Sequence, residues 1–351
     1  MRVVLYGVGD LGERAAYLLA AVLQTSDTLV VAGRHADTVH QVAAMASMVA
    51  LSRGNGPSVD AAVFSLDPDE TRRALIHHAP DALVFCATRF SWWRAAHLPA
   101  STRDALTGAG FGVWLATQAD LPLRLTPVLA SLANKPWLVL GPYPDVVAPL
   151  VKSQGWDRVL GFGNVDELAM LAQGAHPGRA VKLVAHHSVE VHLFGDSILP
   201  PYRLFVEGDD GDWESAALVR PFDWPSGTRS HVFTAASLVR TLRALFGNER
   251  SPIHVPGPHG LPGGYPCVAG GGDLQVALPP GLTLPDALAV NRDGQRADGI
   301  ARIDADGTVW LTASAQASLK RAFGVSWNRL APQNMTALAD ELSQRLNPGA
   351  V

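Results

Sequence analysis

Three glycines near the start of the chain, Gly7, Gly9 and Gly12, stand at the spacing G-x-G-x-x-G. A short apolar run over residues 2–6 precedes them, and a helical pattern rich in alanine and leucine follows. Between a strand and a helix, this spacing is typical of a loop that holds the pyrophosphate of a dinucleotide at a helix N-terminus. The alternative is a tight turn without a ligand. The residues predicted to bind the cofactor here are Gly7, Gly9, Asp10, Leu11 and Gly12.

The end of the second predicted strand, residues 28–32, indicates which dinucleotide binds. An acidic residue about 20 positions beyond the third glycine normally accepts the ribose hydroxyls of NAD. Here the chain reads Gly33-Arg34-His35 instead. A guanidinium can grip a 2′-phosphate with two parallel hydrogen bonds, whereas a carboxylate would repel it. Arg34, with His35 beside it, therefore favours NADP(H) over NAD(H). The alternative for Arg34 is an exposed side chain at a strand end.

A second group of side chains suited to ligand binding follows the fourth predicted strand, residues 81–87. Open α/β sheets bind ligands at the carboxyl ends of their strands. Arginines in the following loop suit an anionic substrate, and the tryptophans between them suit a nicotinamide, an arginine or an aromatic substrate. The alternative is a surface loop whose tryptophans pack at a subunit interface. The predicted substrate-binding residues are Arg89, Trp92, Trp93, Arg94 and, much later in the chain, Thr228.

Composition places the chain among globular proteins and argues against several partners. Of its 351 residues, 48% are hydrophobic and 17% charged, and the net charge of −4 gives no reason to expect nucleic acid. Two cysteines, Cys86 and Cys267, cannot form a disulfide framework and stand in no metal-ligand pattern. No apolar run reaches the roughly 18–20 residues of a membrane helix, and a strand from residue 2 leaves no room for a signal peptide. We expect a cytoplasmic protein without a metal or a membrane partner.

The elements that must position these side chains alternate between strands and helices through the first half of the chain. That rhythm predicts an α/β fold with a doubly wound parallel Rossmann sheet over residues 1–165. An α+β substrate and C-terminal domain is expected over residues 166–351. Within it, residues 182–194 alternate apolar and polar side chains as a strand does. Residues 231–246 read as a helix and residues 251–272, dense in proline and glycine, as a loop.

Several short motifs resemble those of the lactate/malate dehydrogenase superfamily. The glycine loop fits the family's start, and Ala87-Thr88 lies where the family's fourth strand enters its mobile substrate loop. Residues 141–146 (GPYPDV) are similar to the family's N-P-x-D-V, and residues 161–166 (GFGNVD) to its G-x-G-x-x-L-D. Residues 194–197 (FGDS) resemble H-G-D-S, with Asp196 expected to be structural. The resemblance implies cofactor contacts at Ala87, Thr88 and Gly141, a small-molecule substrate, and a homodimer or homotetramer.

The departures from these motifs fall on residues that carry the family's chemistry. In the family, a histidine–aspartate pair moves the hydroxyl proton while hydride passes to or from the nicotinamide. Asp166 matches the aspartate, whereas Phe194 takes the place of the histidine. Ala169 takes the place of the arginine that clamps the substrate, and Gly141 that of an asparagine. An ordinary 2-hydroxy acid reaction is therefore not expected.

Two histidines are candidates for the missing proton-transfer group, which must reach the proton and hold a pKa near the working pH. His192 would point to the same strand face as Phe194, with Asp166 as one carboxylate that could orient it. The alternative for His192 is a polar strand face that meets solvent or a subunit partner. His231, at a predicted helix start, is the second candidate.

Three functions remain open from the sequence. The leading one is an NADP-dependent oxidoreductase that reduces a C=O or C=N bond of a small, anionic substrate. The missing histidine favours C=N reduction, because an iminium is already an electrophile. The second is a non-catalytic NADP(H)-binding sensor or scaffold protein. The third is a redox-neutral enzyme that uses a tightly held cofactor as a transient hydride store.

Overall fold

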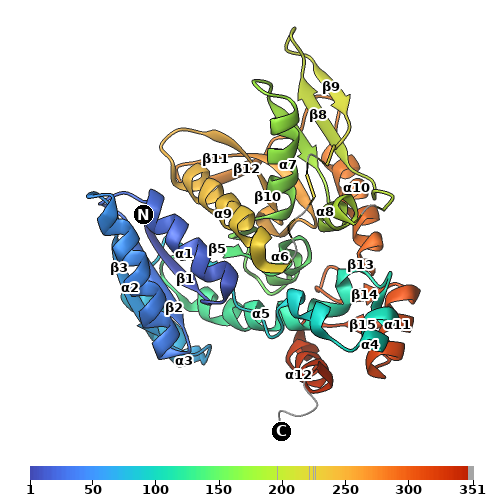
Figure 1. The fold of residues 1–351 in the computed structure, drawn as a ribbon, viewed down its shortest axis with the longest axis horizontal. Helices are drawn as coiled ribbons and strands as arrows, with labels where there is room; N and C mark the ends of the chain where they lie inside the picture. The colour runs from blue at the N-terminus through green and yellow to red at the C-terminus, as the bar shows by residue number, and fades with distance from the viewer. Residues whose placement is uncertain (196, 221, 224, 226, 347–351) are drawn as a thin grey trace.

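A parallel sheet of six strands forms the amino-terminal half of the computed structural model (Figure 1). The structure describes residues 1–195, 197–220, 222–223, 225 and 227–346. The strand order β3-β2-β1-β4-β5-β6 reverses beside β1, and this switch point is where open α/β sheets bind ligands. The predicted doubly wound Rossmann sheet is therefore confirmed. Its strands are β1 (Arg2–Tyr6), β2 (Thr28–Gly33), β3 (Ser58–Val63), β4 (Ala82–Phe85), β5 (Trp137–Leu140) and β6 (Val159–Gly161).

Helices connect these strands, and the central strands between them are buried because both faces of the sheet are covered. Asp67 caps the third helix by accepting hydrogen bonds from two backbone N–H groups of the first turn. The helices are α1 (Asp10–Val22), α2 (Ala36–Ser52), α3 (Pro68–His78), α4 (Ala100–Leu106), α5 (Leu115–Ser131) and α6 (Pro144–Ser153). Two short 3-10 turns, η1 (Trp92–His97) and η2 (Phe111–Trp114), lie between β4 and α5.

The next segment builds an α+β lobe from two antiparallel three-stranded sheets, β7-β8-β9 and β10-β11-β12, with helices beside them. In Figure 1 this lobe rises above the parallel sheet, with α9 lying along α1. Its strands are β7 (Val181–Val184), β8 (Arg203–Glu207), β9 (Trp213–Ala216), β10 (Ser251–Pro256), β11 (Gly264–Gly270) and β12 (Asp273–Val276). Its helical elements are α7 (Asn164–Ala175), α8 (His187–Phe194), η3 (Gly227–Ser230), α9 (His231–Phe246), η4 (Pro258–Gly260) and α10 (Leu284–Ala297).

The predicted strand over residues 182–194 is wrong. Strand β7 ends at Val184 and helix α8 begins at His187. His186 caps that helix, because its Nδ1 accepts a hydrogen bond from the Ser188 backbone N–H at 3.3 Å. Val189 and Leu193, four residues apart, are the helix's buried apolar pair. That spacing fits a helix as well as a strand, so the alternation alone was ambiguous.

The loop predicted over residues 251–272 is also wrong, because most of it forms the hairpin of β10 and β11. A Cβ at Gly264 would lie 2.4 Å from the Cβ of Val165, so this glycine serves close packing of a strand on a helix. Helix α10 was not predicted, although Thr283 and Asp286 form a capping box at its start.

The last segment returns to the first half of the chain. It consists of β13 (Ile300–Ile303), β14 (Val309–Leu311), α11 (Ala313–Phe323), β15 (Arg329–Leu330), η5 (Pro332–Asn334) and α12 (Met335–Leu346). Figure 1 shows α11 beside α4 and α12 beneath α5, and the apolar side chains of these helices share one core. The predicted boundary between residues 165 and 166 stays a prediction. No helix in the described part of the chain has the length and hydrophobicity that crossing a membrane requires.

Candidate active site

The glycine loop joins β1 to α1 with the geometry of a phosphate-binding turn. Gly7 has a φ of +104°, and a Cβ there would lie 2.6 Å from the backbone nitrogen of Ala87. A Cβ at Gly12 would lie 1.8 Å from the Gly7 carbonyl oxygen, whereas the space in front of Gly9 is open. Gly9 is also the N-cap of α1 and gives its first turn no side-chain hydrogen bond. The loop therefore fits the pyrophosphate of a dinucleotide.

Asp10 places a carboxylate in this loop, and two basic side chains offset its charge. Arg14 donates to both carboxylate oxygens at 2.9 and 3.0 Å, and His231 Nδ1 lies 2.7 Å from Oδ2. Burial alone would raise the pKa of Asp10, but these hydrogen bonds outweigh it and hold the pKa below its ordinary value. His231, the first residue of α9, thus joins that helix to the cofactor loop. The ring of Trp92 meets the His231 ring edge to face, 6.5 Å between centroids.

The other predicted cofactor residues lie at the carboxyl ends of neighbouring parallel strands. Arg34 and His35 follow β2, are exposed, and are joined by a hydrogen bond from Arg34 Nε to His35 Nε2 at 3.0 Å. Ala87 and Thr88 follow β4. Gly141 follows β5, and a Cβ there would lie 3.4 Å from the side chain of Leu11. These residues and the glycine loop therefore share one edge of the sheet.

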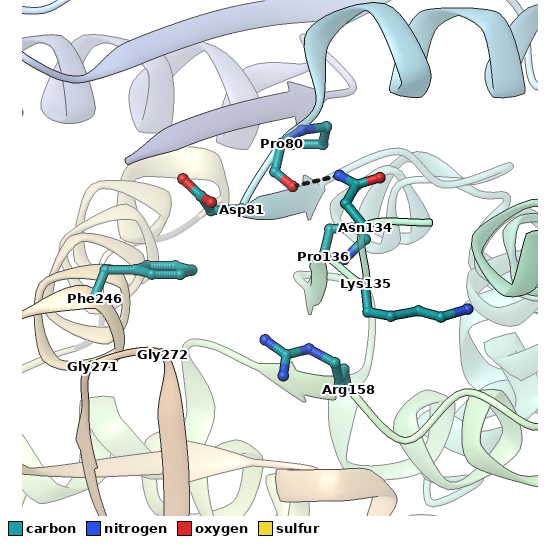
Figure 2. A pocket seen from close by; sticks show the side chains of 9 residues that line it. All are labelled: Pro80, Asp81, Asn134, Lys135, Pro136, Arg158, Phe246, Gly271 and Gly272. Carbon is teal, nitrogen blue, oxygen red and sulfur yellow. Dashed lines mark hydrogen bonds between the residues drawn. The ribbon is translucent and has the colours of Figure 1, made fainter. Parts of the chain in front are cut away.

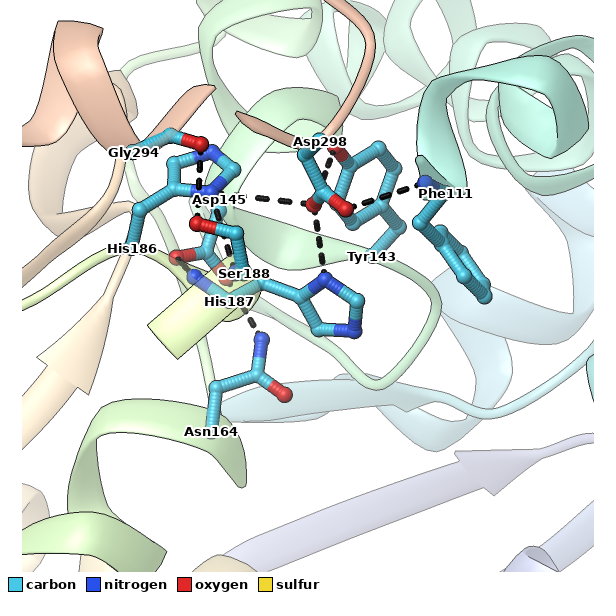
Figure 3. Close-up of polar contacts among 9 residues, drawn as sticks. All are labelled: Phe111, Tyr143, Asp145, Asn164, His186, His187, Ser188, Gly294 and Asp298. Carbon is cyan, nitrogen blue, oxygen red and sulfur yellow. Dashed lines mark hydrogen bonds and ion pairs between the residues drawn. The ribbon is translucent and has the colours of Figure 1, made fainter. Parts of the chain in front are cut away.

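A buried polar cluster that the sequence did not reveal lies at the same edge (Figure 3). At its centre, His187 Nδ1 lies 2.7 Å from Oδ2 of Asp298. Asp298 follows α10 and also accepts hydrogen bonds from the Tyr143 hydroxyl at 2.8 Å and the Phe111 backbone N–H at 2.9 Å. In Figure 3 the Nε2 atom of the His187 ring points away from Asp298. The histidine is thus oriented through one nitrogen and presents the other.

Asp145 fixes the backbone of this histidine. The His187 N–H donates to Asp145 Oδ1 at 3.0 Å, and the Asn164 amide donates to Oδ2 at 2.5 Å. Asp145 lies in the first turn of α6, directly beyond β5, and is fully buried. A carboxylate at the N-terminus of α8 also suits the helix dipole. Asp145 beyond β5 and Asn164 beyond β6 therefore form one hydrogen-bonded group with His187, which follows β7.

The two members of the central pair have opposite pKa shifts. Burial lowers the pKa of His187, but the charge and hydrogen bond of Asp298 outweigh it and raise the pKa above its ordinary value. Burial raises the pKa of Asp298, but His187 outweighs it and lowers the pKa to about 2. Burial lowers the pKa of neighbouring His186, so that ring is neutral. Burial and Asp298 raise the pKa of Tyr143 well above its ordinary value. The ionised Asp298 therefore favours the protonated form of His187.

Two further carboxyl groups lie on α7 and α8, and one of them, Glu167, interacts electrostatically with His187. Glu167 of α7 and Glu190 of α8 share a hydrogen bond, and Thr234 of α9 bonds Glu167 as well. Burial is the main cause that raises the pKa of Glu167 to about 7 and that of Glu190 well above its ordinary value. Glu167 is 2% exposed, and its Oε2 has no hydrogen-bond partner among the described residues. A buried acceptor oxygen is therefore left unsatisfied beside His187.

The catalytic residues predicted from sequence do not meet as expected. Asp166 is fully buried but pairs with Arg240. The Arg240 Nε donates to Asp166 Oδ2 at 3.1 Å, and its Nη2 donates to Oδ1 at 3.4 Å. His192 lies in the last turn of α8, and its Nδ1 is 3.0 Å from both the Ser197 hydroxyl and the Ile198 carbonyl oxygen. Because residues 187–194 are helical, His192 and Phe194 do not share a face, and the geometry predicted for them is wrong. Asp196 lies outside the described residues.

The arginines of the predicted substrate loop contact other residues of the protein. Arg89 Nε lies 2.6 Å from buried Asp120, and a second nitrogen lies 2.9 Å from Asp340 of α12. Arg94 lies over the Phe90 ring at 5.6 Å. Two aromatic rings, Trp93 and His97, pack edge to face, Trp92 is 44% exposed, and Thr228 lies in η3, directly before α9. Arg89 therefore joins the last helix to the Rossmann half instead of standing unpaired.

A visible signal could have pointed to part of the missed cluster. Two adjacent histidines follow a short buried strand, and a tyrosine and an aspartate follow another. Adjacent titratable residues at strand ends are candidates in their own right. Asp298 carries no such signal, because it stands 111 positions from His187 in the sequence.

A cavity of about 430 Å³ lies at the opposite edge of the sheet (Figure 2). Asp81, Pro136 and Arg158 line it directly before β4, β5 and β6, at the amino ends of these strands. The Arg158 guanidinium lies 4.8 Å from the centroid of the Trp137 ring. This cavity does not adjoin the glycine loop or His187, so it is not part of the candidate site.

Solved structures of malate dehydrogenases share this fold. The enzyme of Archaeoglobus fulgidus, solved in complex with NADH, is 15% identical, with a TM-score of 0.53 over 85% of this chain and 100% of that one. The enzyme of Aeropyrum pernix is 14% identical, with a TM-score of 0.51 over 84% and 97% of the two chains. The apo enzyme of Picrophilus torridus is 12% identical, with a TM-score of 0.50 over 85% and 97%. No family model matches the chain, and no curated protein matches it by sequence. The chain has the fold of the malate dehydrogenases, so the resemblance to the lactate/malate dehydrogenase superfamily is confirmed at the level of the fold.

Proposed function

We propose that this protein is an NAD(P)-dependent oxidoreductase that reduces a C=O or C=N bond of a small substrate, with His187 as the proton-transfer residue. The observation that carries this proposal is the 2.7 Å pair of His187 Nδ1 and Asp298 at the sheet edge that also holds the glycine loop. A histidine oriented through Nδ1 by a carboxylate, with Nε2 presented outward, is the arrangement that general acid–base catalysis needs. The shared fold with NADH-bound malate dehydrogenase of Archaeoglobus fulgidus supports the cofactor class.

The cofactor end is proposed to prefer NADP(H). The nicotinamide dinucleotide supplies or accepts a hydride when bound. The glycine loop would hold the pyrophosphate through backbone N–H groups, and exposed Arg34 after β2 would pair with the 2′-phosphate. No carboxylate stands at the strand end to accept the ribose hydroxyls of NAD in its place.

The protein's own groups would manage one proton. His187, kept protonated by Asp298, donates from Nε2 to the oxygen or nitrogen that becomes the alcohol or amine, and it takes that proton back in the reverse direction. Tyr143 and the Phe111 N–H hold Asp298 in place, so the imidazole keeps one orientation. Asp145 fixes the backbone from which the ring projects.

Oxidation of NADPH and NADH against panels of 2-oxo acids, ketones and imines, with and without amines, tests the proposal. We expect turnover with at least one panel, a preference for NADPH, and a large loss of kcat in His187→Gln. The matched control is His192→Gln, which replaces a histidine of the same helix whose Nδ1 contacts Ser197 and Ile198 instead of a carboxylate. The absence of turnover across every panel would contradict the proposal.

A non-catalytic NADP(H)-binding protein is the second candidate. It is favoured by Asp166, whose carboxylate pairs with Arg240 instead of a histidine. Tight NADPH binding without turnover on any panel would support this candidate over the enzyme.

A further inference from the structure

The charge around His187 is unusual for a site that takes an anion. Carboxyl groups gather here from four elements: Asp145 on α6 and Asp298 after α10 contact His187, Glu167 on α7 interacts with it electrostatically, and Glu190 on α8 is hydrogen-bonded to Glu167. In the described part of the chain, the cationic side chains in contact with these groups or with neighbouring Asp166 are His187 itself and Arg240. His187 offsets Asp298, and Arg240 is taken by Asp166. An anionic substrate would therefore meet excess negative charge.

A second, independent observation concerns a buried carboxylate oxygen that has no hydrogen-bond donor among the described residues. Glu167 is 2% exposed, and its Oε2 accepts no hydrogen bond from any described residue. Its other oxygen folds back toward the N-terminus of its own helix, where a Cβ at Gly163 would come within 3.1 Å of Oε1. A buried carboxylate oxygen without a donor costs free energy, so a hydrogen-bond donor from outside the protein, such as a substrate N–H group, would be stabilised there.

We propose that the substrate of this site carries a positive charge on nitrogen: a protonated imine in the reducing direction, or the corresponding ammonium in the oxidising direction. This inference rests on the proposed oxidoreductase function. Glu167 Oε2 would accept a hydrogen bond from the substrate N–H group, and Asp145 would add to the attraction from α6. The anionic substrate expected from Arg89 and Arg94 is less compatible with this site, because Arg89 is already paired with Asp120 and Asp340.

The reaction balances with groups already named. The C=N carbon gains a hydride from NAD(P)H, which leaves as NAD(P)⁺. The π electron pair of the C=N bond becomes the nitrogen lone pair. That nitrogen takes a proton from His187 Nε2, so iminium, hydride and proton together give the ammonium product. The carboxyl groups bind the charged nitrogen of both the iminium and the ammonium, and they transfer no proton in the reaction.

Binding of a cation can be measured without turnover. Isothermal titration calorimetry on protein saturated with NADP⁺ would compare protonated pyrrolidine, neutral cyclopentanol and anionic lactate. We expect pyrrolidine to bind at least about tenfold more tightly than either, because charge-assisted hydrogen bonds are the stronger ones. Equal or tighter binding of cyclopentanol or lactate would overturn the inference, as would the absence of pyrrolidine binding.

Isosteric variants locate the effect. Glu167→Gln keeps the side-chain shape and removes the one negative charge that the hydrogen-bonded carboxyl pair carries, so the ratio of pyrrolidine to cyclopentanol affinity should fall at least about tenfold. Glu249→Gln removes a charge from an exposed turn and should leave that ratio unchanged. An unchanged ratio in Glu167→Gln contradicts the inference. Turnover of pyruvate or cyclopentanone in preference to pyrroline would contradict it while leaving the oxidoreductase proposal intact.

Discussion

The two ends of the candidate active site are built from different materials. The glycine loop is one contiguous turn that would bind through backbone N–H groups, and its single carboxylate, Asp10, is offset by Arg14 and His231. The His187 cluster is assembled from side chains of separate helices, and its carboxyl groups outnumber its cationic side chains. The first end suits an anionic phosphate and the second a cation. Under these two proposals, one fold would hold two adjoining sites that select opposite charges.

Replacement of His187 is expected to have the largest effect, and to affect catalysis without affecting cofactor binding. His187→Gln should lower kcat about 10²- to 10⁴-fold, because proton transfer is lost, while the dissociation constant of NADPH stays unchanged. Steady-state kinetics and fluorescence titration of NADPH measure the two quantities separately. A parallel loss of NADPH affinity would show that the ends are not separable in this way.

Gly12→Ala should break the cofactor end alone. Its Cβ would lie 1.8 Å from the Gly7 carbonyl oxygen, so the loop must shift and NADPH affinity should fall about 100-fold or more. Gly174→Ala is the matched control, because this glycine lies in α7 with open space around it. Titration of NADPH, with circular dichroism to confirm folding, checks both variants; full affinity in Gly12→Ala is the outcome that counts against the loop.

Arg34→Ala sharpens the choice of dinucleotide. Loss of a guanidinium–phosphate pair should weaken NADPH binding about tenfold and leave NADH binding nearly unchanged. The ratio of the two dissociation constants is the measurement. Equal effects on both dinucleotides would refute a 2′-phosphate contact at Arg34.

The pH profile tests the pairing of His187 with Asp298. The pKa of His187 is raised, so the proton donor persists above the ordinary histidine range, and the reduction rate should fall only as pH rises through that raised pKa. Oxidation should show the opposite trend. In Asp298→Asn, burial prevails and lowers the pKa, so the fall should move to lower pH. A profile that does not move in Asp298→Asn argues against the pair.

The smallest expected effect is at Asp10. Asp10→Asn removes a negative charge beside the pyrophosphate, but Arg14 and His231 already offset that charge and the side chain is 29% exposed. NADPH binding should therefore tighten by less than about fivefold. A marked weakening would mean that the carboxylate positions His231 for binding.

The difference between the two ends also explains what the sequence could predict. The glycine spacing, the strand before it and Arg34 lie within one short stretch, so local rules apply. The His187 cluster depends on α8 beginning at His187, and the apolar spacing there fitted a strand equally well. Asp298 reaches it only through tertiary packing, after a helix that the sequence reading omitted. Arg89 could be chosen as a candidate from the sequence, but its pairing with Asp120 and Asp340 could not be predicted.

A crystal structure with bound NADPH tests the central claim most directly, because the claim is that both ends form one site. We predict the pyrophosphate on the N–H groups of residues 7–12 and the nicotinamide against the side of His187 that carries Nε2. A nicotinamide directed away from His187, or protein groups that shield Nε2 from it, would contradict the account.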